Sequence, residues 1–144
     1  MFKLAMAQIW VHDQDEAKAF YTDKLEWEVR QDVTISELGD FRFLTVGPPA
    51  QPEISVALLV IPPPPIFEAD DAAALKSLVA KGKAGGLFLS TDDIHGDYER
   101  LRARGVEFYE TPTQMPYGMD SGFHDPSGNS IRLAQVKDRW EDKV

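Results

Sequence analysis

The chain has 144 residues, which favours one folding unit because two cores of about 70 residues would each be marginally stable. The absence of cysteine excludes disulfides, thiolate zinc sites, iron–sulfur clusters and cysteine nucleophiles. A formal net charge of −9, with no stripe of Lys and Arg among aromatic residues, argues against nucleic acid as a partner.

The composition is that of a globular protein, with 43% hydrophobic and 27% charged residues. No apolar run reaches the roughly 18 residues that span a bilayer, and the first residues lack a basic segment followed by a long apolar one. We therefore expect a cytoplasmic protein with no membrane partner.

The first half of the chain predicts the order β-α-β-β-β. A helix begins near Asp13, which suits an N-cap, and Phe20, Tyr21 and Leu25 recur at helical spacing within it. Short segments rich in β-branched and aromatic residues, each bounded by turn residues, predict strands on both sides of this helix. These strands are expected at residues 3–11, 27–32, 41–46 and 54–61.

A connector over residues 62–83 follows. Its four prolines, 62–65, cannot continue a strand ladder, and the acidic pair Asp70-Asp71 predicts a helix that ends at Gly82.

The second half repeats the order of the first. A strand at 86–91 leads into a helix at 92–105, and three further strands are expected at 106–109, 118–124 and 130–136. The segment 125–129 has the composition of a tight turn. Beyond the last strand, Trp140 is expected either to dock a C-terminal tail or to lie on a frayed end.

The two halves correspond with an offset of 79 residues, which sets Asp13 against Asp92 and Trp27 against Val106. The prediction is a single α+β domain over residues 1–144, built from two βαβββ modules at about 3–61 and 84–136 that pair into a cupped mixed sheet. Such a sheet leaves a concave interior.

These motifs, in this order, resemble the vicinal oxygen chelate superfamily, which contains glyoxalases, bleomycin-resistance proteins and dioxygenases. The resemblance covers residues 3–135. It rests on Asp13 with Phe20-Tyr21 and Leu25, on Asp92-Asp93 with Leu101 and the segment 105–108, and on Tyr117-Gly118 with the turn at 125–129. One departure is Glu26, where the family usually has glycine; a left-handed conformation there would cost about 1 kcal/mol relative to glycine.

The resemblance implies four metal-ligand positions, which fall here on Met6, Ala57, Gly86 and Arg132. None of these side chains suits a divalent metal, so no cofactor is expected, with a divalent metal as the alternative. Gln8 lies two residues beyond Met6 and becomes a candidate ligand if the register is shifted. His12, His95 and His124 have turn or helix-start positions and no metal-binding spacing.

Without a metal, the resemblance favours a small-molecule binding protein of the bleomycin-resistance type, and family members with two modules commonly form homodimers. The alternatives are a metal-dependent glyoxalase I-like lyase or extradiol dioxygenase, and a metal-free isomerase-like enzyme. Strand alternation puts the candidate ligand-binding residues on the inner wall. They are Met6, Gln8, Trp10, Ser55, Ala57, Leu59, Gly86, Phe88 and Arg132.

Five of these residues have a second interpretation. Trp10 and Phe88 either stack a planar ligand or belong to the core. Ala57 and Gly86 either enlarge the cavity or allow a close backbone approach. Arg132 either binds an anionic ligand or pairs with an acid such as Glu53 or Asp120, since an unpaired buried charge costs several kcal/mol.

Overall fold

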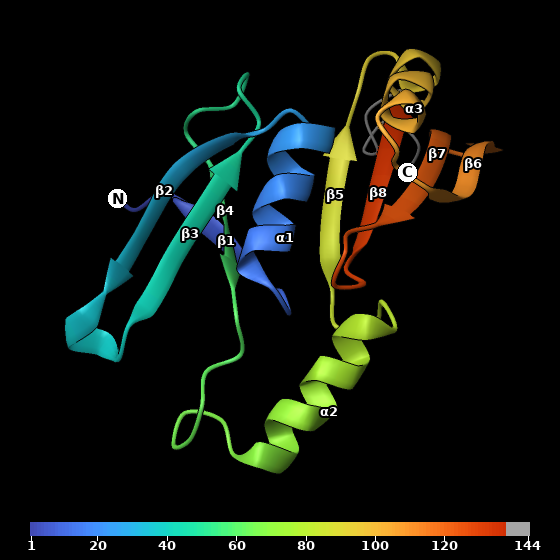
Figure 1. The fold of residues 1–144 in the computed structure, drawn as a ribbon. Coiled ribbons are helices and arrows are strands. Elements are labelled where there is room, and N and C mark those ends of the chain that lie inside the picture. Colours follow the sequence, from blue (N-terminus) through green and yellow to red (C-terminus); the bar gives the residue numbers. More distant parts are fainter. Residues whose placement is uncertain (138–144) are drawn as a thin grey trace.

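Eight strands form two four-stranded mixed sheets in the computed structural model, which describes residues 1–137 (Figure 1). The first sheet has the order β1-β4-β3-β2, with β1 at Met6–Trp10, β2 at Glu28–Ile35, β3 at Phe41–Gly47 and β4 at Ser55–Leu59. The second has the order β5-β8-β7-β6, with β5 at Gly86–Ser90, β6 at Phe108–Met115, β7 at Gly118–His124 and β8 at Ser130–Val136. The interpretation of Trp140 lies outside the described residues.

The same topology in both halves confirms the expected α+β fold of two βαβββ modules. In each sheet the first strand pairs in parallel with the last, and the other pairs are antiparallel. Among the described residues, no strand ladder joins the two sheets. β1 and β5 are therefore each an edge strand of their own sheet.

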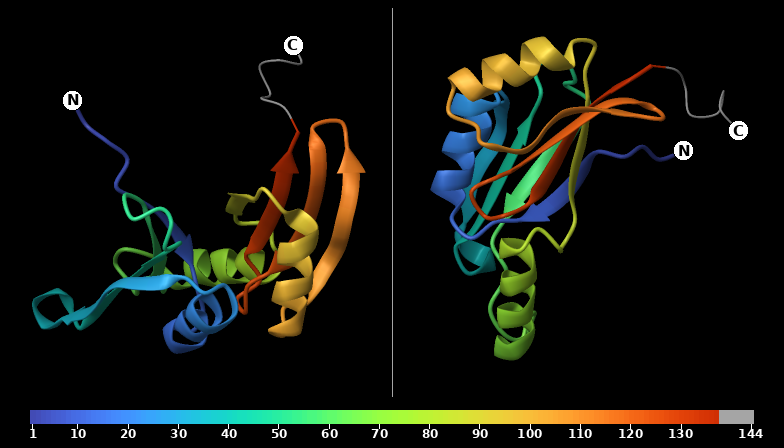
Figure 2. Two further views of the ribbon diagram at one scale, coloured as in Figure 1. Left: turned by 90° about the horizontal axis from the view of Figure 1, so that it is seen from above. Right: turned by 90° about the vertical axis from the view of Figure 1, so that its right-hand side faces the viewer.

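The helices α1 (Gln14–Ala19) and α3 (Ile94–Ala103) lie on one side of the sheets, and the N-terminus and the end of β8 point to the other (Figure 2). Between the modules runs α2 (Ala69–Ala80), close to the expected connector helix. None of the helices in the described part of the chain is long and apolar enough to cross a membrane.

One apolar core joins both modules on the side of α1 and α3. It takes alternate residues from the strands and the inward faces of the two helices, because successive strand side chains point to opposite faces. Its fully buried members include Val11, Tyr21, Leu44, Leu58, Ile94, Phe123 and Ile131. In the part of the chain that the structure describes, α1 and α3 leave the other face of each sheet uncovered (Figure 2).

The turn at 125–129 fastens the second module to the first. The buried Asp125 carboxylate accepts hydrogen bonds from the Tyr21 hydroxyl at 2.9 Å and from the Asn129 side chain at 2.9 Å. Asn129 also donates to the backbone oxygen of Trp10 at 2.8 Å, and Ser127 Oγ accepts from the amide of His12 at 2.9 Å. A segment expected to be only a tight turn is thus a polar contact between modules.

The N-cap residues of the two helices are separated by one residue more than the expected offset of 79. Asp13 and Asp93 are the N-caps, which is an offset of 80 residues, whereas the left-handed residues after the helices, Glu26 and Gly105, are 79 apart. A π-helical turn, Phe20–Lys24, follows α1 and accommodates the additional residue, as such turns characteristically do. Asp93, rather than Asp92, therefore caps the second helix.

The sixth strand is longer than the expected 106–109. Pro112 interrupts the sequence pattern of a strand, but the strand itself continues through this residue. β6 is an edge strand, and its register with β7 shifts between Glu110 and Thr113. Proline is tolerated at such a bulge on an edge, where its missing amide leaves no ladder bond unmade. The extension brings Glu110 beside β7 and β8.

Candidate ligand-binding site

The uncovered face of the first sheet carries six of the nine candidate residues. Core packing of Ile9, Val56 and Leu58 leaves their neighbours in the strands on the opposite face. The six are Met6, Gln8, Trp10, Ser55, Ala57 and Leu59. Gln8 lies directly across from Ala57, which is 1% exposed, while Met6 is 39% exposed.

Trp10 and Phe88, expected as an aromatic pair around a ligand, have different environments. Trp10 packs edge-on against Phe67 of the connector, with ring centroids 5.7 Å apart. Phe88 is 88% exposed, on the edge strand β5. Of the two, only Phe88 presents an aromatic ring free to stack against a ligand.

Gly86 has no space for a side chain, so it does not enlarge a cavity. A Cβ at this position would lie 1.9 Å from the backbone oxygen of Ser130, its partner on β8. Of the two interpretations of this glycine, the close backbone approach is the one the structure has.

Arg132 is held by two carboxylates of its own module. Its guanidinium contacts Glu110 Oε2 at 3.0 Å and Asp120 Oδ2 at 2.8 Å, and donates to the Tyr109 hydroxyl at 3.1 Å. The arginine side chain is 20% exposed and that of Asp120 10%. Arg132 thus forms an internal ion pair with Asp120, one of the two acids considered from the sequence.

Two tyrosines extend this cluster. The Tyr117 hydroxyl donates a short hydrogen bond to Asp120 Oδ2. Tyr109 stacks on the imidazole of His124, with ring centroids 4.4 Å apart, and its hydroxyl also lies 3.1 Å from Ser130 Oγ. We call Arg132, Glu110, Asp120, Tyr109 and Tyr117 the arginine cluster.

The charges in the arginine cluster stabilise one another. Hydrogen bonding to Glu110 raises the pKa of Arg132 further above its ordinary value. Burial by itself raises the pKa of Asp120, but hydrogen bonds from Arg132 and Tyr117 outweigh burial and hold that pKa below its ordinary value. Both groups are therefore charged at neutral pH.

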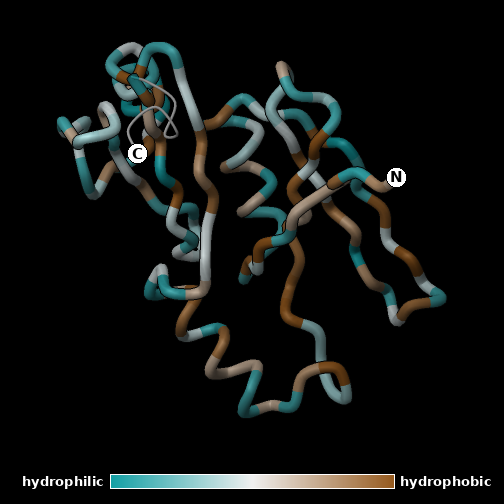
Figure 3. The backbone as a smooth tube through the Cα atoms, turned by 180° about the vertical axis from the view of Figure 1, so that it is seen from behind, coloured by the Kyte–Doolittle hydropathy of each residue, from teal (hydrophilic) through white to brown (hydrophobic). Residues whose placement is uncertain are grey.

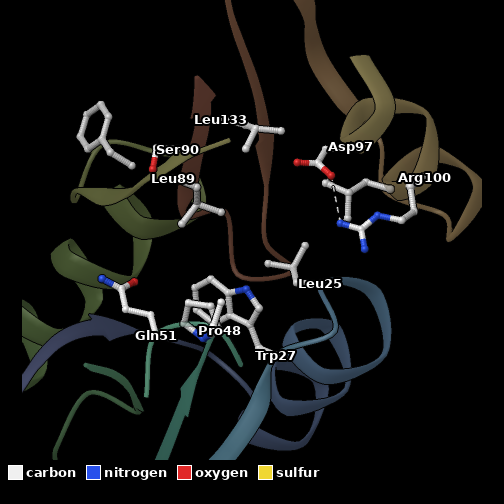
Figure 4. Close-up of a pocket in the computed structure, with 12 residues that line it drawn as sticks. Leu25, Trp27, Pro48, Gln51, Leu89, Ser90, Asp97, Arg100 and Leu133 are labelled. Atoms are coloured by element: carbon white, nitrogen blue, oxygen red, sulfur yellow. Dashed lines mark hydrogen bonds and ion pairs between the residues drawn. The ribbon is translucent and has the colours of Figure 1, made fainter. Parts of the chain in front are cut away.

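Two pockets meet at β5. The first, about 420 Å³, lies between the modules and is shown in Figure 4. Leu25, Trp27 and Pro48 come from the first module, and Leu89, Leu133 and Arg100 from the second. The second pocket, about 460 Å³, lies over the arginine cluster. It is lined by Phe88, Leu89, Ser90, Tyr117, Asp120, Arg132, Ala134 and Val136.

Both pockets have the size of small-molecule sites, and the second also has the apolar walls with few polar groups that such sites show. Phe88, Leu89 and Ser90 line both. Viewed from behind, the hydrophobic stretch of β5 is visible along the strand (Figure 3). The six candidates of the first sheet line neither pocket, so the described geometry gathers only Phe88 and Arg132 among the nine.

The residues at the four implied metal positions do not fit a divalent metal. Met6 offers a soft thioether, Ala57 and Gly86 have no donor atom, and Arg132 is a cation already engaged by carboxylates. Gln8 adds one amide at most. Within residues 1–137, no group of three or more His, Asp or Glu side chains is arranged to hold a metal ion.

The histidines are dispersed. His12 lies beside the connector helix α2, His95 is in the first turn of α3, and His124 stacks on Tyr109.

Comparison with known proteins places the chain in a family. The model of the Glyoxalase/Bleomycin resistance protein/Dioxygenase superfamily matches residues 3–133. The chain belongs to this superfamily. Its relatives include an uncharacterized protein of Shewanella frigidimarina (strain NCIMB 400), 34% identical over 132 residues that cover 90% of each chain.

Two solved structures are similar over almost their whole lengths. UcmS2 is 41% identical, with a TM-score of 0.86, and the match covers 94% of this chain and 99% of UcmS2. TnmS3, an antibiotic binding protein from Streptomyces sp. CB03234, is 28% identical with a TM-score of 0.72 and coverage of 95% and 98%.

Sequence reasoning missed Glu110, Tyr109 and Tyr117 as members of the site. The strand expected to end at residue 109 concealed the first of them. Alternation along residues 118–124 could have placed Asp120 on the face of Arg132, because Phe123 and Ser121 are core residues with the opposite parity.

Proposed function

We propose that this protein binds a small, largely apolar molecule without a metal ion and sequesters it, as a bleomycin-resistance-type member of its superfamily. The observation that carries the proposal is Phe88, a phenyl ring 88% exposed where two pockets of ligand size meet. A large aromatic side chain left in water costs hydrophobic free energy, which a planar ligand stacked on it would recover.

Two further observations support binding rather than metal-dependent lyase or dioxygenase chemistry. The side chains at the family's ligand positions provide no set of metal donors, and a metal ion is what polarises the substrate in such reactions. The relative TnmS3 is described as antibiotic binding, a function that requires affinity but no catalytic group.

We also propose that the chain works as a homodimer in the cytoplasm. The side of the sheets opposite α1 and α3 carries exposed apolar side chains, among them Met6 at 39%, Val33 at 47% and Phe88 at 88% exposure. An apolar patch left open on a folded chain is characteristic of an interface or ligand groove. A second copy covering this side would enclose the pocket over the arginine cluster.

The test of ligand binding is a thermal-shift and calorimetric screen of planar aromatic compounds, including bleomycin-type drugs, against the wild-type chain and Phe88→Ala. We expect at least one compound to stabilise the wild type, by about 2.7 kcal/mol at 100 times its dissociation constant, and Phe88→Ala to weaken it. Lys83→Ala, which changes a side chain outside both pockets, is the control.

Two results would contradict the proposal directly. Stoichiometric nickel, zinc, iron or manganese in protein purified without chelator would favour the metal-dependent lyase or dioxygenase. A ligand that binds the wild type and Phe88→Ala equally would remove Phe88 from the site. For the homodimer, light scattering on the purified chain should give twice the mass of one chain, and a monomer at micromolar concentration would contradict it.

A further inference from the structure

The guanidinium of Arg132 has little capacity left for a ligand. One of its terminal nitrogens contacts Glu110 at 3.0 Å and the Tyr109 hydroxyl at 3.1 Å, and the other contacts Asp120 at 2.8 Å. A ligand carboxylate would have to displace one of these partners. Displacing a partner leaves a partly buried carboxylate without its counter-charge, which is costly.

The arginine cluster has an excess of negative charge. It combines one cation with the carboxylates of Glu110 and Asp120, in a chain whose formal charge is −9. The second oxygen of Asp120, Oδ1, is buried and accepts no hydrogen bond from a side chain among the described residues. Asp120 itself is 7% exposed and lines the 460 Å³ pocket.

Among the described residues, the remaining walls of this pocket carry no charge that would offset the excess. Beyond the arginine cluster, the lining consists of Phe88, Leu89, Ser90, Ala134 and Val136. In such surroundings an anion loses hydration and faces net repulsion, whereas a cation or a neutral donor is attracted to the carboxylates.

We propose that Glu110 and Asp120 set the charge selectivity of this pocket by occupying Arg132, so that the pocket accepts planar ligands bearing an ammonium or a neutral hydroxyl and rejects ligand carboxylates. This selectivity rests on the proposed binding function. An unpaired Arg132 would select an anionic ligand, whereas Arg132 paired with two carboxylates makes the pocket select against anions.

The experiment uses three naphthalene probes of the same shape: 1-naphthylmethylamine, 1-naphthalenemethanol and 1-naphthoic acid. Their dissociation constants are measured by calorimetry on the full chain at pH 7. We expect the amine to bind at least about tenfold more tightly than the acid, with the alcohol between them, because one repulsive charge contact is worth that much at a partly buried site.

Glu110→Gln provides the decisive variant. It frees one side of the Arg132 guanidinium and removes one negative charge, so affinity for naphthoic acid should rise about tenfold while affinity for the amine falls. Glu107→Gln is the control, since it makes the same charge change at an exposed position without a contact to Arg132. Asp120→Asn should shift the order of the probes in the same direction, and it serves as the test if Glu110→Gln folds poorly.

The possible failures are distinct. If the acid binds the wild type as tightly as the amine, or if Glu110→Gln and Asp120→Asn leave the order of the probes unchanged, the selectivity proposal is wrong while ligand binding stands. If no probe binds the wild type or either variant, binding of planar ligands at this pocket fails, and the selectivity with it.

Discussion

The uncovered faces of the two sheets share a topology but not a chemistry. On the first sheet, the uncovered face has no charged group at Met6, Gln8 and Ala57. Its ion pair, Arg30 with Glu28, lies beside Gly47 near the β2 edge. On the second, Arg132 occupies the middle of the face and is paired with Glu110 and Asp120. The same topology therefore carries different side-chain chemistry on the two faces, and the arginine held by carboxylates in the middle of a face belongs to the second module.

The largest difference between the modules is the buried turn at 125–129, which the first module lacks. Asp125→Ala should lower the free energy of unfolding by about 3 kcal/mol or more, because the Tyr21 hydroxyl and the Asn129 amide lose a buried acceptor. Urea denaturation followed by circular dichroism measures this. Asp92→Ala, at an exposed acid before α3, should change stability by less than about 0.5 kcal/mol. Equal losses would mean that the turn does not fasten the modules.

The two uncovered faces should also respond differently to the same new side chain. Arg132→Met leaves Glu110 and Asp120 without their cation and should destabilise the fold by about 2 kcal/mol, less than for a fully buried pair because Arg132 is 20% exposed. Gln8→Met, on the first sheet, should be within about 0.5 kcal/mol of the wild type. Thermal unfolding of both variants makes the comparison, and a stable Arg132→Met would show that the ion pairs contribute little.

Acid should weaken both modules through one carboxylate each. Hydrogen bonds from Arg42 and Lys18 hold the pKa of Asp32 below its ordinary value, and the pKa of Asp120 is lowered as well. A depressed folded-state pKa contributes stability above the unfolded value near 4 and loses it as the pH falls below that value.

Asp32→Asn should therefore lower the free energy of unfolding by about 1 kcal/mol at pH 7 and flatten its fall between pH 5 and pH 2. Chemical denaturation across this range is the measurement. A variant whose pH profile parallels that of the wild type would remove Asp32 as a source of acid sensitivity.

The smallest expected effect concerns the ends of the two helices. Glu26 has a φ of 61°, at the position that Gly105 occupies in the second module. Its carboxylate contacts Arg100 of α3 and Arg104, the C-cap residue of that helix. Glu26→Gly removes about 1 kcal/mol of backbone strain and also loses exposed ion pairs worth a similar amount. We expect a net change within about 0.5 kcal/mol by thermal denaturation, whereas Glu26→Ala, which keeps the strain and loses the pairs, should be less stable.

Much of the fold could be read from local patterns. The helix starts at Asp13 and near Asp93, the turn at 125–129 and the alternation of Ile9 and Leu58 are signals within a few residues. The full length of β6 could not be predicted from the sequence, because Pro112 is compatible with a strand only on an edge with a bulge. The π-turn after α1 likewise has no local sequence signature that distinguishes it from ordinary helix.

The candidate site depended more on tertiary structure. Alternation gives the face on which Phe88 and Arg132 lie, but not that Phe88 is exposed while Trp10 packs on the connector. The sequence offered both an internal and an external partner for Arg132. The choice depended on β6 and β7 bringing Glu110 and Asp120 within 3.0 Å of it.

The amino-acid sequence by itself determined the two βαβββ modules and their superfamily, because these depend on residue type and on spacing along the chain. Only the tertiary structure decided that the Ser130 backbone leaves no space for a side chain at Gly86 and that the turn at 125–129 joins the modules. It also decided that Arg132 pairs with carboxylates on neighbouring strands. The reason is that burial and charge pairing are properties of atoms brought together from distant parts of the chain.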